Sequence, residues 1–549
     1  MRNQRNQWTA ISITMLIASG SQPSSAEDMS NRNAVHVVRP TRPTRPPDPN
    51  PDNNNAFSRM FPELPSFAPS NDAVREQASK LGAKGGVIDA LDNVTDPTQS
   101  IANAGPRNPD NPAMTAGMTF LGQFIDHDLT LALKAPLRET TDPRRTENFR
   151  TAAFDLDQLY GDGPGEDPEL YDASSGDFKF RVVAIPGSQL VSRKGAVRYD
   201  LPRDANNNAL IADSRDDENV VISQLHMAMM KFHNAVVERL RADPQNARST
   251  PRKIFAMAQR QVRWHYQWII LHEYLPLTIG QDRVDAILKN GPRFYRVNNR
   301  GRGDAQGARN ARNEPQIPIE FSVAAFRFGH SQVRPSYRLN FGPDGGPSFV
   351  APILDDTIDP ANPDPADLRG GKRAARRFVD WQTFFKFDAD NFRLNKRIDT
   401  KISSALFQLP GSRGLSPGLP SDGVQSLASR NLMRHVNYGI PSGQAIARTI
   451  GVPVLAPSQL AELVPYGMEQ STPLWYYILK ESELVENGTR LGPVGSLIVG
   501  EVLIGLLKAD DESYLSARKN WTPDLPSAQG GQFGMTDLLK FAGVVPPLQ

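Results

Sequence analysis

The chain has 549 residues, of which 39% are hydrophobic, so it is long enough to bury one large core or several ordinary ones. Its formal net charge is only +2, and its lysines and arginines are scattered, which argues against a nucleic-acid partner. The absence of cysteine excludes thiolate metal sites, thioether attachment of a cofactor and disulfides, and leaves His, Asp, Glu and Met as ligands.

The N-terminal residues have the pattern of an export signal. Arg2 and Arg5 give a positive start, residues 10–18 form a short apolar run, and residues 24–26 offer a small-residue cleavage site. The run is too short to span a bilayer as a mature helix. We therefore predict a signal peptide at residues 1–26 and a secreted or periplasmic protein, with no transmembrane span. A disordered tail with a chance apolar patch is the alternative.

Residues 27–56 are dominated by proline, asparagine and charged side chains. Such a segment cannot bury enough apolar surface to fold, so we predict a disordered linker with polyproline-like character. No second linker of this kind and no internal repeat follows it. We therefore expect residues 57–549 to form a single catalytic domain.

Helical patterns dominate that domain. Apolar residues recur at steps of three and four through residues 221–240, which indicates an amphipathic helix. Thr250 and Pro251 read as the start of a long helix that we expect to end before Pro276. Residues 491–507 are apolar but contain glycine, proline and glutamate, so a buried core helix is favoured over a membrane span. The predicted fold class is mainly α, with few short strands.

The most informative stretch is residues 122–130, a polar insertion inside an apolar helical run. Gln123, Asp126 and His127 fall at i, i+3 and i+4, so their side chains share one helix face. Asp128 is turned by about 100° from His127 and must serve another partner. Burying these groups costs free energy unless they are paired or ligated, which favours a functional site over a hydrogen-bonded core histidine.

Residues 151–161 place oxygen-bearing side chains in alternation with apolar ones. If this segment is extended, Thr151, Asp155 and Asp157 lie on one side of it. Calcium prefers six to eight oxygen ligands, and Asp128 could complete the set by clamping this loop to the helix of His127. A solvated acidic turn explains the loop alone about as well.

Two further segments carry candidate residues. Arg215 and Glu218 precede the helix at residues 221–240, where they are either ordinary helix-start charges or a guanidinium and carboxylate aimed at a site. His330 follows a glycine in an apolar context and could be an axial metal ligand whose other nitrogen needs a partner.

Asn431 and Arg434 are candidates to support His330 as such a ligand.

For His226 and His233, which flank the apolar stripe of their helix, we expect solvated or core-edge positions.

Taken together, these segments resemble the animal-type haem peroxidases of the peroxidase and cyclooxygenase superfamily, in a bacterial version without disulfides. The matching segments occur in the family's order between residues 113 and 511: residues 122–128, 151–161, 214–218, 327–330, 431–434 and 490–493. The resemblance implies a large, helical, single-domain haem peroxidase fold for residues 57–549.

The resemblance also implies roles for individual residues. His127 matches the distal histidine that exchanges protons with hydrogen peroxide, and Gln123 and Arg215 match the distal glutamine and arginine. His330 matches the proximal ligand of the haem iron, and Asn431 matches the residue that accepts its other N–H. Arg434 lies with Asn431 among the residues expected to bind the cofactor.

Covalent and metal links follow from the same resemblance. Asp126 and Glu218 match carboxylates that form esters with haem, so the cofactor is expected to be haem b or an ester-linked derivative. The expected calcium ligands are Asp128, Thr151, the carbonyl of Ala153, Asp155 and Asp157. Asp157 stands where the family usually has a serine, which keeps an oxygen ligand but adds charge.

Two departures narrow the expected activity. Asn219 replaces the methionine that bonds to haem in the most strongly oxidising members, which disfavours chloride as a donor. Arg327 stands at the position of the radical-forming tyrosine of the cyclooxygenase branch, which disfavours fatty-acid oxygenation.

We therefore expect a secreted peroxidase that reduces hydrogen peroxide and oxidises bromide, iodide, thiocyanate or phenolic donors; the sequence leaves its oligomeric state open. A haem-bearing adhesion protein that uses residues 302–304 (Arg-Gly-Asp) is one alternative. A calcium or zinc hydrolase without haem is another.

Overall fold

The computed structural model describes residues 55–92, 97–98, 105–132, 136–176, 178–297, 315–359, 361–387, 391–409 and 423–546. These residues all belong to one compact unit of the chain. The predicted signal peptide, the predicted linker up to residue 54 and the tripeptide at residues 302–304 lie outside the described residues. These assignments, and the boundaries drawn from them, stay predictions.

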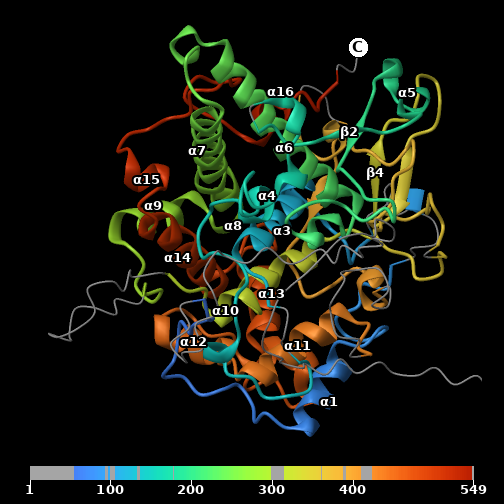
Figure 1. The fold of residues 1–549 in the computed structure, drawn as a ribbon. Coiled ribbons are helices and arrows are strands. Elements are labelled where there is room, and N and C mark those ends of the chain that lie inside the picture. Colours follow the sequence, from blue (N-terminus) through green and yellow to red (C-terminus); the bar gives the residue numbers. More distant parts are fainter. Residues whose placement is uncertain are drawn as a thin grey trace, which may run out of the picture. The chain divides into compact units, whose positions relative to one another are not determined.

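Helices dominate the described residues, so the mainly α fold class is confirmed (Figure 1). The longer α-helices are α1 (Asp72–Leu81), α3 (Gly117–Leu129), α6 (Val220–Ala242), α7 (Pro251–Ile269), α9 (Gln281–Asn290), α11 (Leu427–Tyr438), α12 (Gly443–Ile450), α13 (Leu474–Val485) and α14 (Pro493–Ala509). The shorter ones are α4 (Asp157–Tyr160), α5 (Ser188–Val191), α8 (Leu275–Ile279), α10 (Ile319–Ser322), α15 (Tyr514–Ala517) and α16 (Met535–Phe541). Two 3₁₀ helices matter for the site: η5 (Ser214–Asp217) and η8 (Ala325–Gln332).

Strands are few and short in the described part of the chain. Antiparallel pairs form between β1 (Asp110–Thr115) and β6 (Leu394–Lys396), between β2 (Val183–Ala184) and β3 (Tyr199–Asp200), and between β4 (Ser336–Asn340) and β5 (Phe349–Pro352). Each pair is a two-stranded ribbon, so none of them can form a core alone. The core is therefore built by helices.

Helix α3 is enclosed by other elements on almost every side. It packs against α4, α6, η5 and η8, and Phe124, Ile125 and Leu129 on it are completely buried. The helix ends where Thr130 turns extended and its N–H donates to the Asp126 carbonyl at 2.9 Å. A helix buried this deeply leaves only its polar face open to an internal space.

The junction between η5 and α6 is held by side-chain caps. Asp213 accepts the Arg215 N–H at 2.9 Å, and Asn219 accepts the Ile222 N–H at 2.9 Å. These bonds satisfy backbone donors that have no partner inside a helix. They fix the backbone of residues 213–219 between the two helices.

The α-helix opened by Pro251 ends at Ile269, before Pro276 as expected, but the backbone stays helical beyond that point. Helix α7 continues into a π-helical turn (Ile270–Tyr274), and α8 then includes Pro276 in its first turn. A proline fits there because a residue of the first turn needs no intrahelical N–H partner. The extra residue of the π turn resets the backbone phase, and Tyr274 of this turn reaches the cavity described below.

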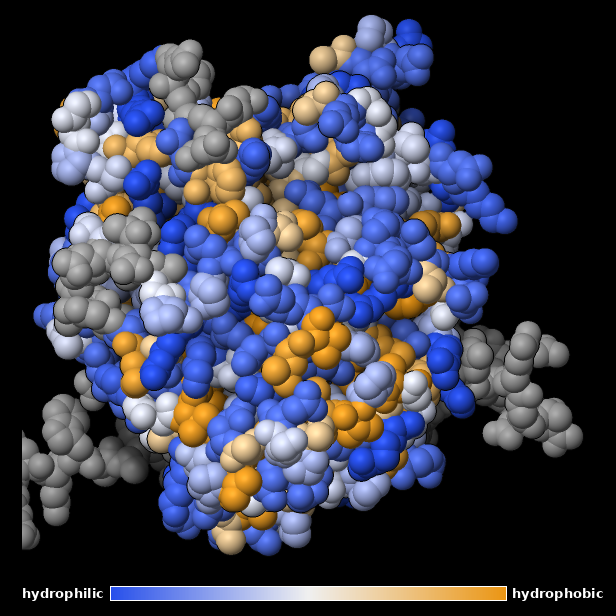
Figure 2. Space-filling view, turned by 180° about the vertical axis from the view of Figure 1, so that it is seen from behind, coloured by the Kyte–Doolittle hydropathy of each residue, from blue (hydrophilic) through white to orange (hydrophobic). Residues whose placement is uncertain are grey.

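Helix α14 is buried along most of its length. Its one acidic residue, Glu501, accepts the backbone N–H groups of Phe294 and Tyr295 at 2.7 and 2.9 Å. Within the described residues, no helix combines the length and apolar character that crossing a membrane requires. The face of the molecule in Figure 2 is covered mostly by hydrophilic residues, with apolar ones in small groups between them, as is ordinary for a folded protein.

Candidate functional site

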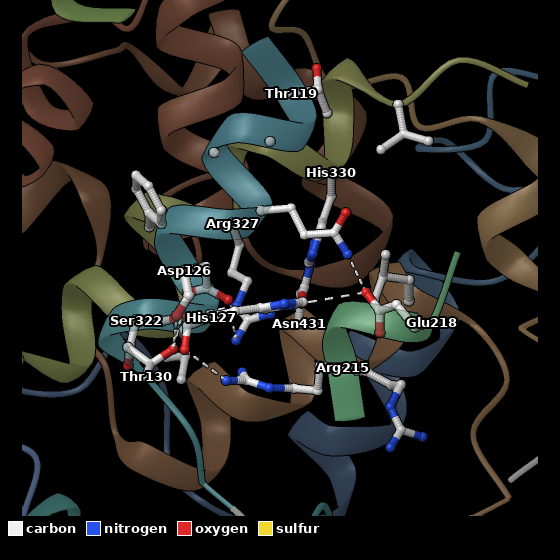
Figure 3. Close-up of a pocket in the computed structure, with 18 of the residues that line it drawn as sticks. Thr119, Asp126, His127, Thr130, Arg215, Glu218, Ser322, Arg327, His330 and Asn431 are labelled. Atoms are coloured by element: carbon white, nitrogen blue, oxygen red, sulfur yellow. Dashed lines mark hydrogen bonds and ion pairs between the residues drawn. The ribbon is translucent and has the colours of Figure 1, made fainter. Parts of the chain in front are cut away.

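A cavity of about 400 Å³ opens between α3, η5, η8 and α11. Its volume lies in the range of roughly 300–1,000 Å³ that is typical of small-molecule and cofactor sites. Figure 3 shows side chains from these elements gathered around one space. The lining includes all the residues that the sequence analysis named for catalysis or haem binding: Gln123, Asp126, His127, Arg215, Glu218, His330, Asn431 and Arg434.

His127 is buried on the last turn of α3, with one ring nitrogen held and the other left toward the cavity. Its Nδ1 lies 2.6 Å from Asp216 Oδ1. Its Nε2 lies 4.0 Å from Glu218 Oε1, the ion pair marked by a dashed line in Figure 3. Burial alone would raise the pKa of Asp216, but the hydrogen bonds from His127 and His226 outweigh it and lower the pKa. Because an ionised carboxylate only accepts hydrogen bonds, the proton of His127 sits on Nδ1.

Arg215 is fixed at the same wall. Its Nη2 donates to the His127 carbonyl at 3.0 Å and to Asp213 Oδ2 at 2.7 Å. Asp213 is almost completely buried, which would raise its pKa, but Arg215 and then Arg150 hold that pKa well below the ordinary value. The guanidinium therefore keeps its charge and its orientation beside His127.

Glu218 forms the third side of this wall. Gln123 Nε2 donates to Glu218 Oε1, and Asn219 Nδ2 donates to Gln123 Oε1 at 3.4 Å. Burial raises the pKa of Glu218, and the nearby His127 and Arg215 partly offset that rise. The glutamine thus links a residue of α3 to the start of α6 across the cavity wall.

Asp126 lies one residue before His127 and points to a different partner. Its Oδ1 accepts the Thr130 hydroxyl at 3.1 Å, and its Oδ2 lies 3.8 Å from Arg327 Nη2. Arg327 Nε in turn donates to the Ser322 carbonyl at 2.9 Å. This ion pair connects α3 to η8, so it spans the two walls of the cavity.

His330 of η8 lines the cavity together with His127. Its Nδ1 lies 2.8 Å from the amide nitrogen of Asn431; rotating that amide by half a turn would place the amide oxygen there as acceptor. Burial, together with Arg327, lowers the pKa of His330 to about 3, so the imidazole is neutral at neutral pH. A neutral imidazole with one nitrogen held is the form that binds metals.

Arg434 lies one turn after Asn431 on α11 and also lines the cavity. The neighbouring Arg430 does the same, and its Nη1 donates to the Val424 carbonyl at 2.8 Å. These guanidinium groups bring positive charge to one edge of the cavity, where they suit carboxylate groups of a ligand.

A second cluster lies behind α3. Ligand atoms of Asp128, Asp155 and Asp157 lie within 4.8 Å of one another. Asp128 is completely buried, and neither of its oxygens accepts a hydrogen bond of good geometry from the described residues, although the Tyr266 hydroxyl lies nearby. Burial, followed by repulsion from Asp155 and Asp157, raises the pKa of Asp128 well above its ordinary value. Orphaned oxygens of this kind suit a hard cation such as calcium.

The segment that carries this cluster is not extended, so that expectation is wrong. Residues 152–155 form a bend, Leu156 has φ 60°, and Asp157 begins helix α4. The bend is closed by a hydrogen bond from the Asp157 N–H to Asp155 Oδ1 at 3.2 Å. Local side-chain bonds such as this compete with extended structure.

The other predicted calcium ligands, Thr151 and Ala153, lie just before this bend and within it. Thr151 Oγ1 donates to Asp155 Oδ2 at 2.8 Å, its N–H donates to Asp157 Oδ2 at 3.1 Å, and Ala153 lies inside the bend.

Arg150 joins the two clusters. Its Nε lies 3.6 Å from Asp157 Oδ1, and its Nη2 donates to Asp213 Oδ2 at 2.6 Å. Its side chain is 1% exposed, so this guanidinium compensates buried carboxylates rather than a solvated surface. Burial raises the pKa of Asp157 to about 8, and the nearby Arg150 acts against that rise by favouring the ionised carboxylate.

Asp216 and Arg150 were not expected from the sequence, and the expectation of solvated or core-edge positions for His226 and His233 is wrong. Both histidines are completely buried. His226 Nδ1 bonds to Asp216 Oδ2 at 2.7 Å, and His233 Nδ1 lies 3.1 Å from the Tyr160 hydroxyl. The heptad spacing of the two histidines on one helix face was the available signal, and it favours shared burial as much as shared exposure.

Comparisons with known proteins found a family model, curated relatives and solved structures that resemble this chain. The family model described as animal haem peroxidase matches residues 134–348, which include Arg215, Glu218 and His330. The chain is 23% identical over 305 residues to peroxinectin A of Dictyostelium discoideum, covering 54% of this chain and 48% of that protein. It is 24% identical over 212 residues to human thyroid peroxidase, covering 36% of this chain and 21% of that protein. It thus spans less than half the length of these curated relatives.

Solved structures extend the likeness beyond the segment that the family model matches. Peroxidase A of Dictyostelium discoideum superposes with a TM-score of 0.52 at 18% identity, over 87% of this chain and 93% of that one. At this identity the likeness shows the fold, and it covers most of the present chain. The family match and the relatives show that part of this chain is similar to animal haem peroxidases, and the shared fold extends that similarity over most of the chain.

Proposed function

We propose that this protein is a haem peroxidase that reduces hydrogen peroxide and oxidises small anions such as bromide, iodide and thiocyanate, or phenolic donors. One observation carries the proposal: His127 with Arg215, and His330 with Asn431, line the same cavity from different elements. An imidazole poised as a base, a fixed cation and a neutral imidazole ligand are the groups that peroxide chemistry on haem requires.

The residues present fit haem. The cavity combines the neutral imidazole of His330 with apolar walls and with the guanidinium groups of Arg430 and Arg434 at one edge. In this arrangement His330 would bind the iron through Nε2, with the amide of Asn431 turned to accept the Nδ1 proton. Arg434 would face a propionate. Bound haem would supply the iron that exchanges electrons with peroxide and donor.

On the opposite wall, the side chains would move a proton and hold a charge. His127 Nε2 would take a proton from hydrogen peroxide and return it to the departing oxygen. Arg215 would stabilise the negative charge that develops between these two transfers, because its orientation is already set by Asp213. Gln123 would line the space left for a small substrate.

We also propose ester links from Asp126 and Glu218 to haem methyl carbons; each new C–O bond would replace a C–H bond, with hydrogen peroxide as the oxidant, reduced to water. Both carboxylates line the cavity, where burial raises the pKa of Glu218. Asn219 offers an amide where a methionine would be needed for a further link, so efficient chloride oxidation is not expected. Acid–acetone extraction tests these links. The haem of the wild type should resist extraction, and the haem of the double variant D126A/E218A should be extracted.

Calcium is the cation that we propose for the cluster of Asp128, Asp155 and Asp157, with Thr151 and the Ala153 carbonyl as further ligands. The orphaned oxygens of Asp128 support this assignment. The ion would pull the bend of residues 152–155 onto α3. Calorimetric titration with calcium tests this assignment. Binding should be abolished in D128N and retained in D162N, a control variant in the same region.

We further propose export through residues 1–26, giving a secreted or periplasmic protein. The support is the sequence pattern alone, because these residues lie outside the described part of the chain. Fractionation of cells that express the full chain, with residues 10–18 made polar in a control, tests this proposal.

The activity is tested by adding haem to the purified full chain and recording its absorption spectrum, followed by steady-state oxidation of iodide, bromide, thiocyanate and a phenol with peroxide. We expect a Soret band and turnover of at least one donor. Absence of a Soret band would overturn the proposal and would leave a hydrolase or adhesion protein to be considered.

A further inference from the structure

Asp216 occupies an unusual position among the buried carboxylates of this region. It is completely buried, and its two oxygens are shared between two imidazoles: Oδ1 lies 2.6 Å from His127 Nδ1, and Oδ2 lies 2.7 Å from His226 Nδ1. The three groups come from three different elements, namely α3, η5 and α6. No backbone turn explains the convergence.

The neighbouring carboxylates are paired differently. Asp217 binds the Arg203 guanidinium at 2.6 and 2.8 Å, and Asp213 binds Arg150 and Arg215. Among the described residues, Asp216 has no guanidinium or ammonium partner, only the two histidines. A carboxylate kept for stability alone would be expected to have a cation like those of its neighbours.

We propose that Asp216 is a positioning residue for His127, whose ring it orients and whose proton it confines to Nδ1, so that Nε2 faces the cavity as an acceptor. This inference rests on the proposed peroxidase function. An ionised carboxylate accepts hydrogen bonds at both oxygens and donates none. His127 and His226 must therefore each donate from Nδ1 to Asp216. In the neutral imidazole, His127 Nε2 then keeps its lone pair, which a base needs before it can take a proton.

His226 serves the carboxylate rather than the cavity. Its Nε2 is buried and has no hydrogen-bond partner among the described residues, so its bond to Asp216 is its one polar contact there. It therefore fixes the second oxygen of Asp216 and prevents the carboxylate from rotating away from His127.

A substitution separates this role from simple packing. In Asp216→Asn the side chain keeps its shape but has one acceptor oxygen and one donor NH₂. It can accept from one imidazole only, so the other must move its proton to Nε2 or lose its bond. Asp217→Asn is the matched control, because it removes an adjacent buried carboxylate that does not contact His127.

The first readout is the position of the ring protons. Nitrogen-15 histidine spectra of the diamagnetic carbon monoxide complex should show protonated Nδ1 in both His127 and His226, identified by the variants His127→Ala and His226→Gln. Asp216→Asn should lose at least one of these signals, and Asp217→Asn should keep both. Retention of both signals in Asp216→Asn would overturn the proposal. So would a wild-type His127 that is protonated on Nε2 and not on Nδ1, and this second test does not depend on a variant that folds.

The second readout is kinetic. Asp216→Asn should lower the second-order rate constant with peroxide by about 10- to 100-fold, the usual cost of losing a group that orients a metal-site residue. Its haem content and the donor-limited rate at saturating peroxide should be unchanged. A peroxide rate within about twofold of wild type, or an equal loss in Asp217→Asn, would contradict the role. Absence of haem binding or peroxide reaction in the wild type would refute the proposed function, whereas the proton positions would still test Asp216.

Discussion

The two walls of the cavity present the same side chain in different settings. His127 on the α3 wall has its Nδ1 held by the carboxylate of Asp216, and His330 on the η8 wall has its Nδ1 beside the amide of Asn431. Asp216 Oδ1 lies 2.6 Å from His127 Nδ1, and the amide nitrogen of Asn431 lies 2.8 Å from His330 Nδ1, where a half-turn of the amide would place its neutral oxygen. A charged acceptor makes a shorter and stronger bond than a neutral one, so it holds the ring and its proton more firmly.

The two imidazoles also differ in the charged groups around them. His127 lies among Arg215, Glu218 and Asp213, which form a network of opposite charges. For His330, burial and Arg327 lower the pKa to about 3, which keeps the ring neutral. These settings match the roles proposed above, in which His127 exchanges protons and His330 is a neutral ligand.

The largest expected effect comes from removing His330, the proposed ligand of the haem iron. His330→Ala should abolish stable haem binding, because no other imidazole among the described residues lines that wall. The ratio of Soret to protein absorbance measures it. His272→Ala, which removes an exposed histidine stacked on Trp268, is the control and should retain haem. Full haem content in His330→Ala would refute the assignment.

The matching change on the other wall should spare the cofactor. His127→Ala should keep the haem but slow its reaction with peroxide by about 10²- to 10⁴-fold, the range for loss of a general acid–base group. Stopped-flow spectroscopy at low peroxide concentration gives this rate. An unaltered peroxide rate would show that His127 is not the residue that exchanges protons with peroxide.

Replacing the amide of Asn431 by a carboxylate tests whether the group beside Nδ1 causes the difference between His330 and His127. Asn431→Asp should make the His330 wall resemble the His127 wall and donate more electron density to the iron. We expect the ferric–ferrous potential to fall by about 60 mV, a tenfold change in a one-electron equilibrium. Spectroelectrochemical titration measures it. A potential that rises, or does not move, would show that the amide is not the tuning group.

The smallest effect is expected from the link to the carboxylate cluster. Arg150→Met leaves Asp157 without its partner and removes one of two guanidinium groups from Asp213. Arg215 should then be held less firmly, and the peroxide rate should fall by less than about tenfold. The potential set by the His330 wall should not change. A shift in that potential would mean that Arg150 acts on the whole domain rather than on one wall.

Parts of this site could be predicted from the sequence because they depend on local periodicity. The shared face of Gln123, Asp126 and His127 follows from helical spacing, and all three line the cavity. The caps at Asp213 and Asn219 fix η5 and the start of α6, where Arg215 and Glu218 lie. The family's motif order likewise indicated that His330 and Asn431 would serve one site.

Other parts could not be predicted, because local patterns have competing solutions. Alternation at residues 151–157 suggested an extended segment, but side-chain bonds close it into a bend. Pro276 suggested a helix end, but a π turn before it allows α8 to follow directly. In both cases the sequence contains the correct residues and the geometry depends on which hydrogen bonds form.

By itself, the sequence determined the mainly α fold, the export pattern and the helix face that carries Gln123, Asp126 and His127. Only the tertiary structure decided the partners of those side chains. His127 and Asp216 are 89 positions apart in the chain, and Arg150 and Asp213 are 63 apart. Such pairs form because buried charges must find a partner wherever packing brings one, and periodicity along one segment holds no information about that packing.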